Sequence, residues 1–225
     1  MEAGFWHERW AANKIGFHLD EVNPYLVRYW PELNLPLGSR VFVPLAGKTL
    51  DIIWLMQQGF EVIANEISDI AVQAFFKEQG LNYEVSDWAH GKAYQSDKLR
   101  FLSGDMFELS RADLGQVDAI YDRASFIALP ESMRPGYIKQ LFALTGIVPQ
   151  MLVTLEYDQS QMAGPPFGVM QSEVQYSYSS KYQQPPEIPL EPAIRVDVLD
   201  DHAHFAARGL TSMFECVYLL QVPKK

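Results

Sequence analysis

Two stretches, Arg40-Val-Phe-Val-Pro-Leu-Ala-Gly-Lys48 and Glu61-Val-Ile-Ala-Asn-Glu-Ile67, carry the strongest structural pattern in this sequence. The first has the pattern of a buried strand that runs into a turn at Gly47 and then into a helix. The second is another apolar strand, and it ends on an acid, Glu66, roughly 20 residues after the turn. A strand, a glycine turn and an acid at the end of the next strand form the adenosine-binding half of a doubly wound sheet.

The same two signals indicate a kind of ligand. The carboxylate of Glu66 can accept hydrogen bonds from two vicinal hydroxyls, such as those of a ribose. A dinucleotide site normally has further glycines around the pyrophosphate, whereas Gly47 stands alone here. The pattern therefore favours a cofactor with adenosine and no phosphate, such as S-adenosyl-L-methionine. The alternative for Glu66 is an ordinary surface acid, and a nicotinamide-dependent oxidoreductase is the less favoured class of enzyme.

Composition narrows the class of protein further. The chain has 225 residues, of which 48% are hydrophobic, enough for one domain with a sizeable core. No apolar run approaches 18 residues, and the first residues lack the pattern of a signal peptide, so we expect neither a membrane span nor a membrane partner. A single cysteine, Cys216, fits the reducing cytoplasm. A net charge of −10 with scattered lysines and arginines argues against nucleic acid and favours a small-molecule substrate. We expect a monomer.

Strand and helix patterns alternate along most of the chain. The expected helices are 5–29, 48–58, 69–79 (with Ser68 as N-cap and Gly80 after its end) and 131–144. The expected strands are 41–45, 61–67, 99–103, 117–121, 151–157, 194–199 and 213–222. The order predicts an α/β fold: a Rossmann-like, mostly parallel seven-stranded sheet that ends in an antiparallel hairpin, with helices on both faces. We expect a single domain over residues 1–225. Within it, an N-terminal helical lid covers about 1–30 and a proline-rich substrate loop covers about 158–192.

Several residues at the predicted strand ends could bind ligands. The backbone from Leu45 to Gly47 could approach the methionine part of the cofactor. Asp105 and Met106 follow the third strand, where an adenine would lie, although Ser103-Gly104-Asp105 is equally consistent with a simple turn. Arg123 closes the fourth strand and could hold a carboxylate or an anionic acceptor, or could pair with a neighbouring acid.

Aromatic and histidine residues give weaker signals. Trp10 and Phe17 lie on the N-terminal segment, where an aromatic stripe indicates core packing more often than a ligand site. The five histidines show no metal-ligand spacing, so no metal is expected. Cys216 lies between apolar residues and is interpreted as a buried small side chain.

Seven segments in order resemble the thiopurine S-methyltransferase family, its bacterial members especially, over nearly the whole chain. These segments are Phe5-Trp-His-Glu-Arg-Trp10 with Gly16-Phe-His18, Val41-Phe-Val-Pro-Leu-Ala-Gly-Lys48, Val62-Ile-Ala-Asn-Glu-Ile-Ser68, Tyr121-Asp-Arg-Ala124, Tyr157-Asp158, Gly164-Pro-Pro-Phe167 and Phe214-Glu-Cys-Val-Tyr-Leu-Leu220.

The resemblance implies transfer of a methyl group from S-adenosyl-L-methionine to the sulfur of aromatic or heterocyclic thiols such as thiopurines. A heteroaromatic thiol is more acidic than an alkyl thiol, so no obligatory base is expected, and Arg123 could stabilise the thiolate. Phe17 would lie beside the acceptor, and His204 stands where mammalian relatives have a second substrate-facing arginine. Implied cofactor contacts are Trp10, Leu45, Glu66 and Arg123, with the backbone near Asp105 and Met106 on the adenine side. Gly47 is added to these cofactor contacts from its place in the turn.

Other functions are compatible with the same fold. One alternative is a methyltransferase for selenium or tellurium oxyanions or for a small amine. Another is a sensor that binds the adenosyl ligand without turnover.

Overall fold

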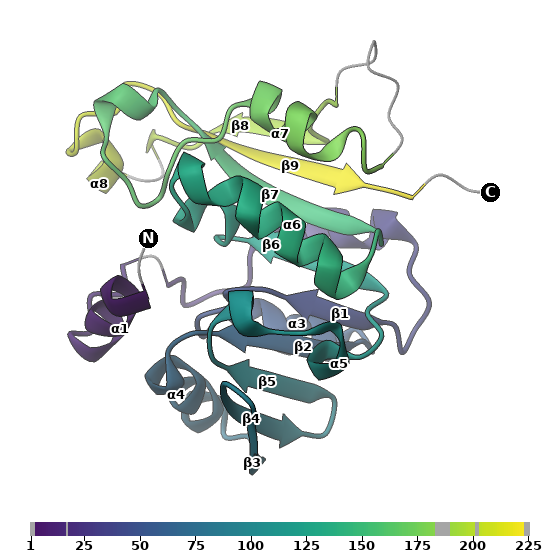
Figure 1. Cartoon of the computed structure of the whole chain (residues 1–225). Coiled ribbons are helices and arrows are strands. Elements are labelled where there is room, and N and C mark those ends of the chain that lie inside the picture. Colours follow the sequence, from purple (N-terminus) through teal and green to yellow (C-terminus); the bar gives the residue numbers. More distant parts are fainter. Residues whose placement is uncertain (1–2, 17, 183–189, 201–202, 223–225) are drawn as a thin grey trace. The chain divides into compact units, whose positions relative to one another are not determined.

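The computed structural model describes residues 3–16, 18–182, 190–200 and 203–222, with the side chains of residues 203 and 204 excepted (Figure 1). The chain divides into two compact units. The first comprises Met1–Tyr121 and Gln140–Gly146, and the second comprises Asp122–Lys139 and Ile147–Lys225.

The first unit is built on a sheet with the strand order β3-β4-β5-β2-β1-β6. Its centre is parallel, because β1 pairs with both β2 and β6, and β2 pairs with β5. Strands β3 and β4 continue the sheet in antiparallel fashion beyond β5. The bounds of the strands are β1 Arg40–Val43, β2 Glu61–Glu66, β3 Glu84–Trp88, β4 Gly91–Ser96, β5 Leu99–Ser103 and β6 Ala119–Arg123. The last two residues of β6, Asp122 and Arg123, belong to the second unit.

The helices of this unit are mostly short. They are α1 Ala3–Ala11, α2 Pro24–Tyr29, η1 Trp30–Leu33, α3 Asp51–Gln57, α4 Asp69–Gln79, η2 Met106–Glu108 and α5 Arg111–Leu114. Aromatic side chains from α4, β4 and β5 pack together in the core, with ring centroids 5.6 Å apart for Phe75 and Phe101 and 5.8 Å apart for Phe76 and Tyr94. Strand β2 is buried from Val62 to Glu66 without alternation, as expected of a strand covered on both faces.

The second unit contains an antiparallel sheet with the order β7-β9-β8. Its elements are η3 Phe126–Ala128, η4 Glu131–Met133, β7 Gln150–Glu156, η5 Gln159–Gln161, α7 Gln171–Tyr178, β8 Ile194–Asp197, α8 Ala203–Ala206 and β9 Phe214–Leu220. Helix α6, Arg134–Thr145, begins in this unit and ends in the first. The antiparallel pairing of β8 with β9 confirms the expected hairpin.

The fold class is confirmed, with differences of detail. All seven expected strands are present, and β3 and β4 are two strands that the sequence analysis missed. Four of the five side chains of β3 are exposed, so the strand lacks the apolar pattern by which strands are recognised.

The expected N-terminal helix over 5–29 was wrong, because it is two helices. Helix α1 ends at Ala11, and the φ of +51° at Asn13 shows that the backbone is no longer helical there. Asn23 then starts α2, since its Oδ1 accepts hydrogen bonds from the backbone N–H groups of Tyr25 (2.8 Å) and Leu26 (3.2 Å).

Other helix bounds differ less. The helix expected from residue 48 begins at Asp51, and the one expected from residue 131 begins at Arg134, after a 3₁₀ turn. Helix α4 has the predicted bounds, and Gly80 has a φ of +63° after its end. Ser68 is at the N-cap position, but its side chain makes no capping hydrogen bond. The predicted substrate loop is not irregular throughout, because α7 forms there around the buried Val174 and Tyr178.

Candidate cofactor site

Glu66 lies at the carboxyl end of β2 and is only 5% exposed. Its Oε2 accepts a hydrogen bond from the backbone N–H of Gly47 at 2.9 Å, and its Oε1 accepts one from the backbone N–H of Ser68 at 2.9 Å. The indole N–H of Trp10 also donates to this carboxylate. The acid is therefore a buried group held by two turns and a tryptophan, and the alternative of an ordinary surface acid was wrong.

The turn after β1 brings its backbone to Glu66. Leu45 and Gly47 have φ values of +45° and +57°, in the left-handed region that a residue with a side chain rarely adopts. The backbone N–H of Ala46 donates to the carbonyl of Asn65 at 2.7 Å, which ties the turn to β2. A Cβ atom at Gly47 would lie 3.2 Å from Cζ2 of Trp10. Glycine thus permits both the turn and the close approach of the indole.

The environment of Glu66 favours its neutral form. Burial raises the pKa of Glu66 to about 7, because the charged form loses its hydration. The hydrogen bonds from Ser68, Gly47, Ile67 and Trp10 oppose this increase. Near neutral pH the group is poised between an acceptor-only carboxylate and a carboxylic acid.

Hydrogen bonds attach the turn after β5 to the end of β2 at Glu66. The side-chain amide of Asn65 donates to the carbonyls of Leu102 (3.1 Å) and Gly104 (2.9 Å), and the carbonyl of Glu66 accepts from the N–H of Gly104 (2.9 Å). Asn65 was missed by the sequence analysis. A polar residue within the otherwise apolar run Val62-Ile-Ala-Asn65 was the available signal.

The structure places Asp105 and Met106 directly after this turn. Oδ1 of Asp105 accepts a hydrogen bond from the backbone N–H of Phe107 at 2.9 Å and so caps η2, as the turn interpretation expects. Met106 is buried. Four of the predicted cofactor contacts meet in the first unit, in a region that we call the Glu66 corner: Trp10, Leu45, Gly47 and Glu66. Asp105 and Met106 follow the turn after β5, which Asn65 ties to this corner. Their contacts with adenine stay a prediction.

Three predicted site residues belong to the second unit or lie outside the described residues. Arg123 is the last residue of β6 and is partly buried. The backbone of His204 is part of α8, but its side chain lies outside the described residues, and so does Phe17. The roles of these three residues remain predictions.

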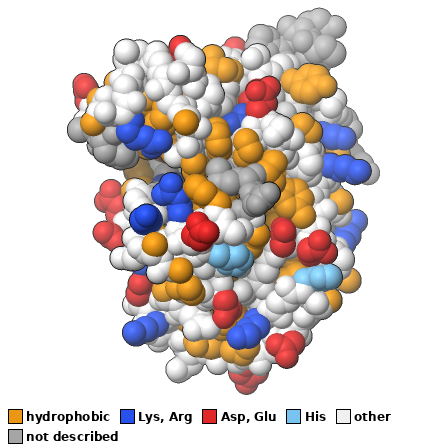
Figure 2. Space-filling view, turned by 60° about the vertical axis from the view of Figure 1, so that its left-hand side comes forward, with side chains coloured by type: hydrophobic (Ala, Val, Ile, Leu, Met, Phe, Trp, Pro, Cys, Tyr) orange, Lys and Arg blue, Asp and Glu red, His pale blue; other side chains and the backbone are white. Residues whose placement is uncertain are grey.

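The described residues hold no cluster of three or more His, Cys, Asp or Glu side chains suited to a metal ion. In the same part of the chain, none of the helices has the length and apolar character needed to cross a bilayer. Acidic and basic side chains are interspersed on the face shown in Figure 2.

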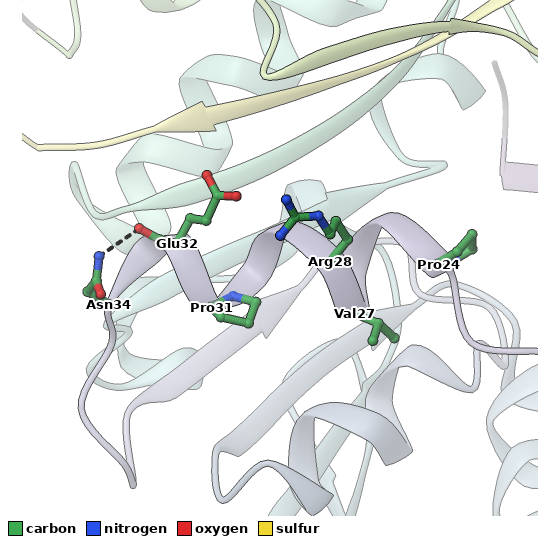
Figure 3. A pocket seen from close by; sticks show the side chains of 6 residues that line it. All are labelled: Pro24, Val27, Arg28, Pro31, Glu32 and Asn34. Atoms are coloured by element: carbon green, nitrogen blue, oxygen red, sulfur yellow. Dashed lines mark hydrogen bonds between the residues drawn. The ribbon is translucent and has the colours of Figure 1, made fainter.

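Two hollows are lined by residues other than Trp10, Leu45, Gly47 and Glu66. One, of about 710 Å³, lies over α2 and η1, and its lining residues are labelled in Figure 3. The other, of about 990 Å³, belongs to the second unit. Its lining includes residues 158, 159, 167 and 168 of the predicted substrate loop, together with Arg134 and Arg195.

Comparison with known proteins gives a consistent result. The family described as "Thiopurine S-methyltransferase (TPMT)" matches residues 1–223. Thiopurine S-methyltransferase of Pseudomonas fluorescens (strain Pf0-1) is 44% identical over 221 residues, which cover 98% of this chain and 99% of that protein. The protein of the same name from Bordetella petrii is 43% identical over 222 residues, which cover 98% and 99%.

Solved structures show the same fold at low sequence identity. Burkholderia thailandensis 1,6-didemethyltoxoflavin-N1-methyltransferase, with bound S-adenosylhomocysteine, has a TM-score of 0.61 at 14% identity and covers 97% of this chain and 87% of its own. Magnesium protoporphyrin IX methyltransferase of Synechocystis PCC 6803, with bound SAH, has a TM-score of 0.59 at 12% identity and covers 96% and 99%. The fold is that of Rossmann-like methyltransferases. By its sequence the chain belongs to the thiopurine S-methyltransferase family, an enzyme family whose members use S-adenosyl-L-methionine, as the sequence analysis expected.

Proposed function

We propose that this enzyme transfers the methyl group of S-adenosyl-L-methionine to the sulfur of aromatic or heterocyclic thiols such as thiopurines. Membership of the family supports the choice of reaction. The observation that carries the cofactor assignment is the buried carboxylate of Glu66, fixed beside a turn with a single glycine. We also expect a monomer in the cytoplasm, with a role in xenobiotic metabolism.

The Glu66 corner fits the cofactor chemically. Each carboxylate oxygen has more than one acceptor position, so the backbone bonds from Gly47 and Ser68 leave acceptor capacity for two ribose hydroxyls. The absence of further glycines in the turn suits a ligand without pyrophosphate. Leu45 and Gly47 would face the methionine part, and Asp105 and Met106 the adenine.

Trp10 supports the proposal of an N-terminal lid. Its side chain is buried, packs against the position where Gly47 lacks a Cβ atom, and donates to Glu66. A ribose that binds Glu66 would therefore share or replace this contact of Trp10. We propose that residues 1–30 close over the cofactor through Trp10, with Phe17 towards the acceptor.

The chain's own contribution to the reaction is proposed to be positioning. Bound S-adenosyl-L-methionine supplies an activated methyl group, which passes to sulfur by in-line displacement as a neutral thioether departs. Holding the reacting atoms in line can lower a barrier by about 7–11 kcal/mol. A heteroaromatic thiol is acidic enough to need no strong base, and the guanidinium of Arg123, assisted by His204, would lower its pKa further.

The experiment is a methyl-transfer assay with two heteroaromatic thiols of different pKa, measured as a function of pH. We expect Arg123→Ala to slow transfer most at pH values where the thiol is still protonated, whereas Arg123→Lys retains part of the effect. An equal loss at every pH would contradict the role of Arg123 in acceptor ionisation. Selenite, tellurite and a small amine serve as alternative acceptors. Cofactor binding without turnover of any acceptor would instead favour the sensor.

A further inference from the structure

Asp122, which immediately precedes Arg123 on β6, is completely buried. Its Oδ2 accepts a hydrogen bond from the hydroxyl of Tyr137 at 2.7 Å and a longer one from the side-chain amide of Gln150 at 3.4 Å. These donors come from α6 and β7, so two elements fix the carboxylate from outside its own strand.

The carboxylate also reaches forward along its own chain. The backbone N–H of Phe126 and the side chain of Ser125 lie close enough to oppose the rise of its pKa, whereas its Oδ1 has no hydrogen-bond partner among the described residues. The hydroxyl of Ser125 donates in turn to the carbonyl of Arg123 at 3.4 Å. Asp122 thereby joins the two ends of the turn that includes Arg123.

The turn from Arg123 to Phe126 is strained at Ala124 and is anchored at Phe126. Ala124 has a φ of +62°, in the left-handed region that a residue with a side chain rarely adopts. Phe126 is fully buried, with its ring 6.0 Å from those of Tyr137 and Tyr178 and with the guanidinium of Arg134 5.3 Å from its centroid. Strain of this kind persists where surrounding contacts over-determine the backbone, and it concentrates at functional sites.

The side chains that interact with Asp122 come from α6, β7, α7, the residues just after α7 and the turn after β6. They are Tyr137 of α6, Gln150 of β7, Tyr178 of α7, Tyr182 after α7, and Ser125 of the turn. None of these groups is a cation. The buried carboxylate loses its hydration, and the hydrogen bonds from Tyr137 and Gln150 offset part of that cost.

We propose that Asp122 is the positioning residue of Arg123: its buried carboxylate, held by Tyr137, fixes the turn from Arg123 to Phe126 and so sets the direction of the Arg123 guanidinium. The proposal rests on the proposed function, in which Arg123 contacts the acceptor or the cofactor. Asp122 does not touch either molecule and acts through Arg123 alone.

The test combines Asp122→Asn, which keeps the shape and removes the charge, with Arg123→Ala and the double variant. Displacement of a reacting group by about 1 Å can cost roughly 100-fold in rate, so we expect Asp122→Asn to lower kcat/KM by about 10- to 100-fold. The double variant should be no slower than Arg123→Ala, because both changes remove the same contribution. A double variant whose loss in kcat/KM equals the product of the two single losses would overturn the proposal.

Asp51→Asn is the matched control. Asp51 is an equally buried aspartate that accepts from a tyrosine hydroxyl, that of Tyr121 at 2.9 Å, and from the backbone N–H of Asn23 at 2.8 Å. We expect its kcat/KM to stay within about threefold of wild type. A loss equal to that of Asp122→Asn would show a general effect of buried aspartates and overturn the proposal.

A second measurement separates this proposal from the proposed function. The Nε–Hε signal of Arg123 in a ¹H–¹⁵N spectrum reports the guanidinium environment without any turnover. We expect Asp122→Asn, and more weakly Tyr137→Phe, to shift this signal, whereas Asp51→Asn leaves it in place. An unchanged signal in folded Asp122→Asn and Tyr137→Phe would overturn the proposal. A shifted signal together with full activity of Arg123→Ala would instead contradict only the role of Arg123 in the reaction.

Discussion

Glu66 of the first unit and Asp122 of the second are both buried acids near the carboxyl end of a parallel strand. Burial raises the pKa of Glu66 to about 7 and the pKa of Asp122 to about 6. Their hydrogen-bond donors differ in kind. Glu66 is held mainly by backbone N–H groups of the adjoining turns, whereas Asp122 is held by the side chains of Tyr137 and Gln150.

This difference separates two uses of a buried carboxylate. Backbone donors fix Glu66 within a corner assembled from turns, which suits a group that binds a ligand directly. Side-chain donors lock Asp122 into the packing of its unit, which suits a group that fixes a neighbouring turn. The two acids should therefore respond differently when their charge, their partner or the adjoining backbone is changed.

The largest expected effect is on the pH dependence of stability. At Glu66 the folded-state pKa of about 7 exceeds the ordinary value of 4.5, so between these values the folded state binds the extra proton. The stabilisation is therefore complete below pH 4.5 and is lost as the pH rises through 7, a change of about 3 kcal/mol. Urea unfolding of wild type and Glu66→Gln between pH 4 and 8 should show the difference in unfolding free energy shift across this window.

The same experiment on Asp122→Asn should give its shift at lower pH. For Asp122 the pH range over which stability is lost runs from the ordinary pKa of 3.8 to the folded-state pKa of about 6. Profiles of wild type and either variant that stay parallel from pH 4 to 8 would contradict the assignment of that acid as a buried, proton-binding group.

Removing the side chain of Asp122 should destabilise the fold by leaving its partner unsatisfied. For Asp122→Ala we expect a loss of about 1–3 kcal/mol, since the Tyr137 hydroxyl loses its 2.7 Å acceptor. In Asp122→Ala/Tyr137→Phe part of that loss should be recovered. Denaturant titrations of the four species form a double-mutant cycle, and strictly additive losses would show that the hydrogen bond contributes nothing.

Gly47→Ala tests the turn that holds Glu66. The φ of +57° and the 3.2 Å approach of Trp10 should make alanine unfavourable by about 1–2 kcal/mol. Gly4→Ala in α1 is the control, because Gly4 has no atom within 4 Å of its Cβ position. Equal thermal unfolding of the two variants would mean that the turn is not constrained as described.

The smallest effect is expected at Ala124. Glycine should relieve the strain of the +62° φ while adding chain entropy to the unfolded state, for a net gain of a few tenths to about 1 kcal/mol. Thermal unfolding measures the change. A clear loss of stability would show that the methyl group of Ala124 packs favourably enough to outweigh the strain.

The sequence predicts one of these two regions much better than the other. The Glu66 corner depends on neighbours close along the chain or at the ends of consecutive strands, so a strand, a glycine turn and an acid reveal it. The donors to Asp122 lie 15 and 28 residues away, and only the folded chain brings Tyr137 and Gln150 to it. Tyrosines in a helical pattern are indistinguishable from ordinary core residues.

The fold shows the same limit. Buried parallel strands such as β1 and β2 have apolar runs that can be read directly. Strand β3, with its exposed side chains, has no such pattern and was missed. The hydrogen bonds of Asn65 could not be predicted either. Their acceptors, the carbonyls of Leu102 and Gly104, lie at the end of a strand that is far from Asn65 in the sequence.

The central claim is that Glu66 binds the ribose of the cofactor. The most direct test is calorimetric titration of wild type and Glu66→Gln with S-adenosylhomocysteine and with its 2′,3′-dideoxyribose analogue. Losing a charge-assisted hydrogen bond costs about 1.5–3 kcal/mol, so we expect the variant to bind S-adenosylhomocysteine roughly 10- to 100-fold more weakly. The two proteins should bind the dideoxy analogue with similar affinity. Equal affinity of both proteins for S-adenosylhomocysteine would contradict the claim.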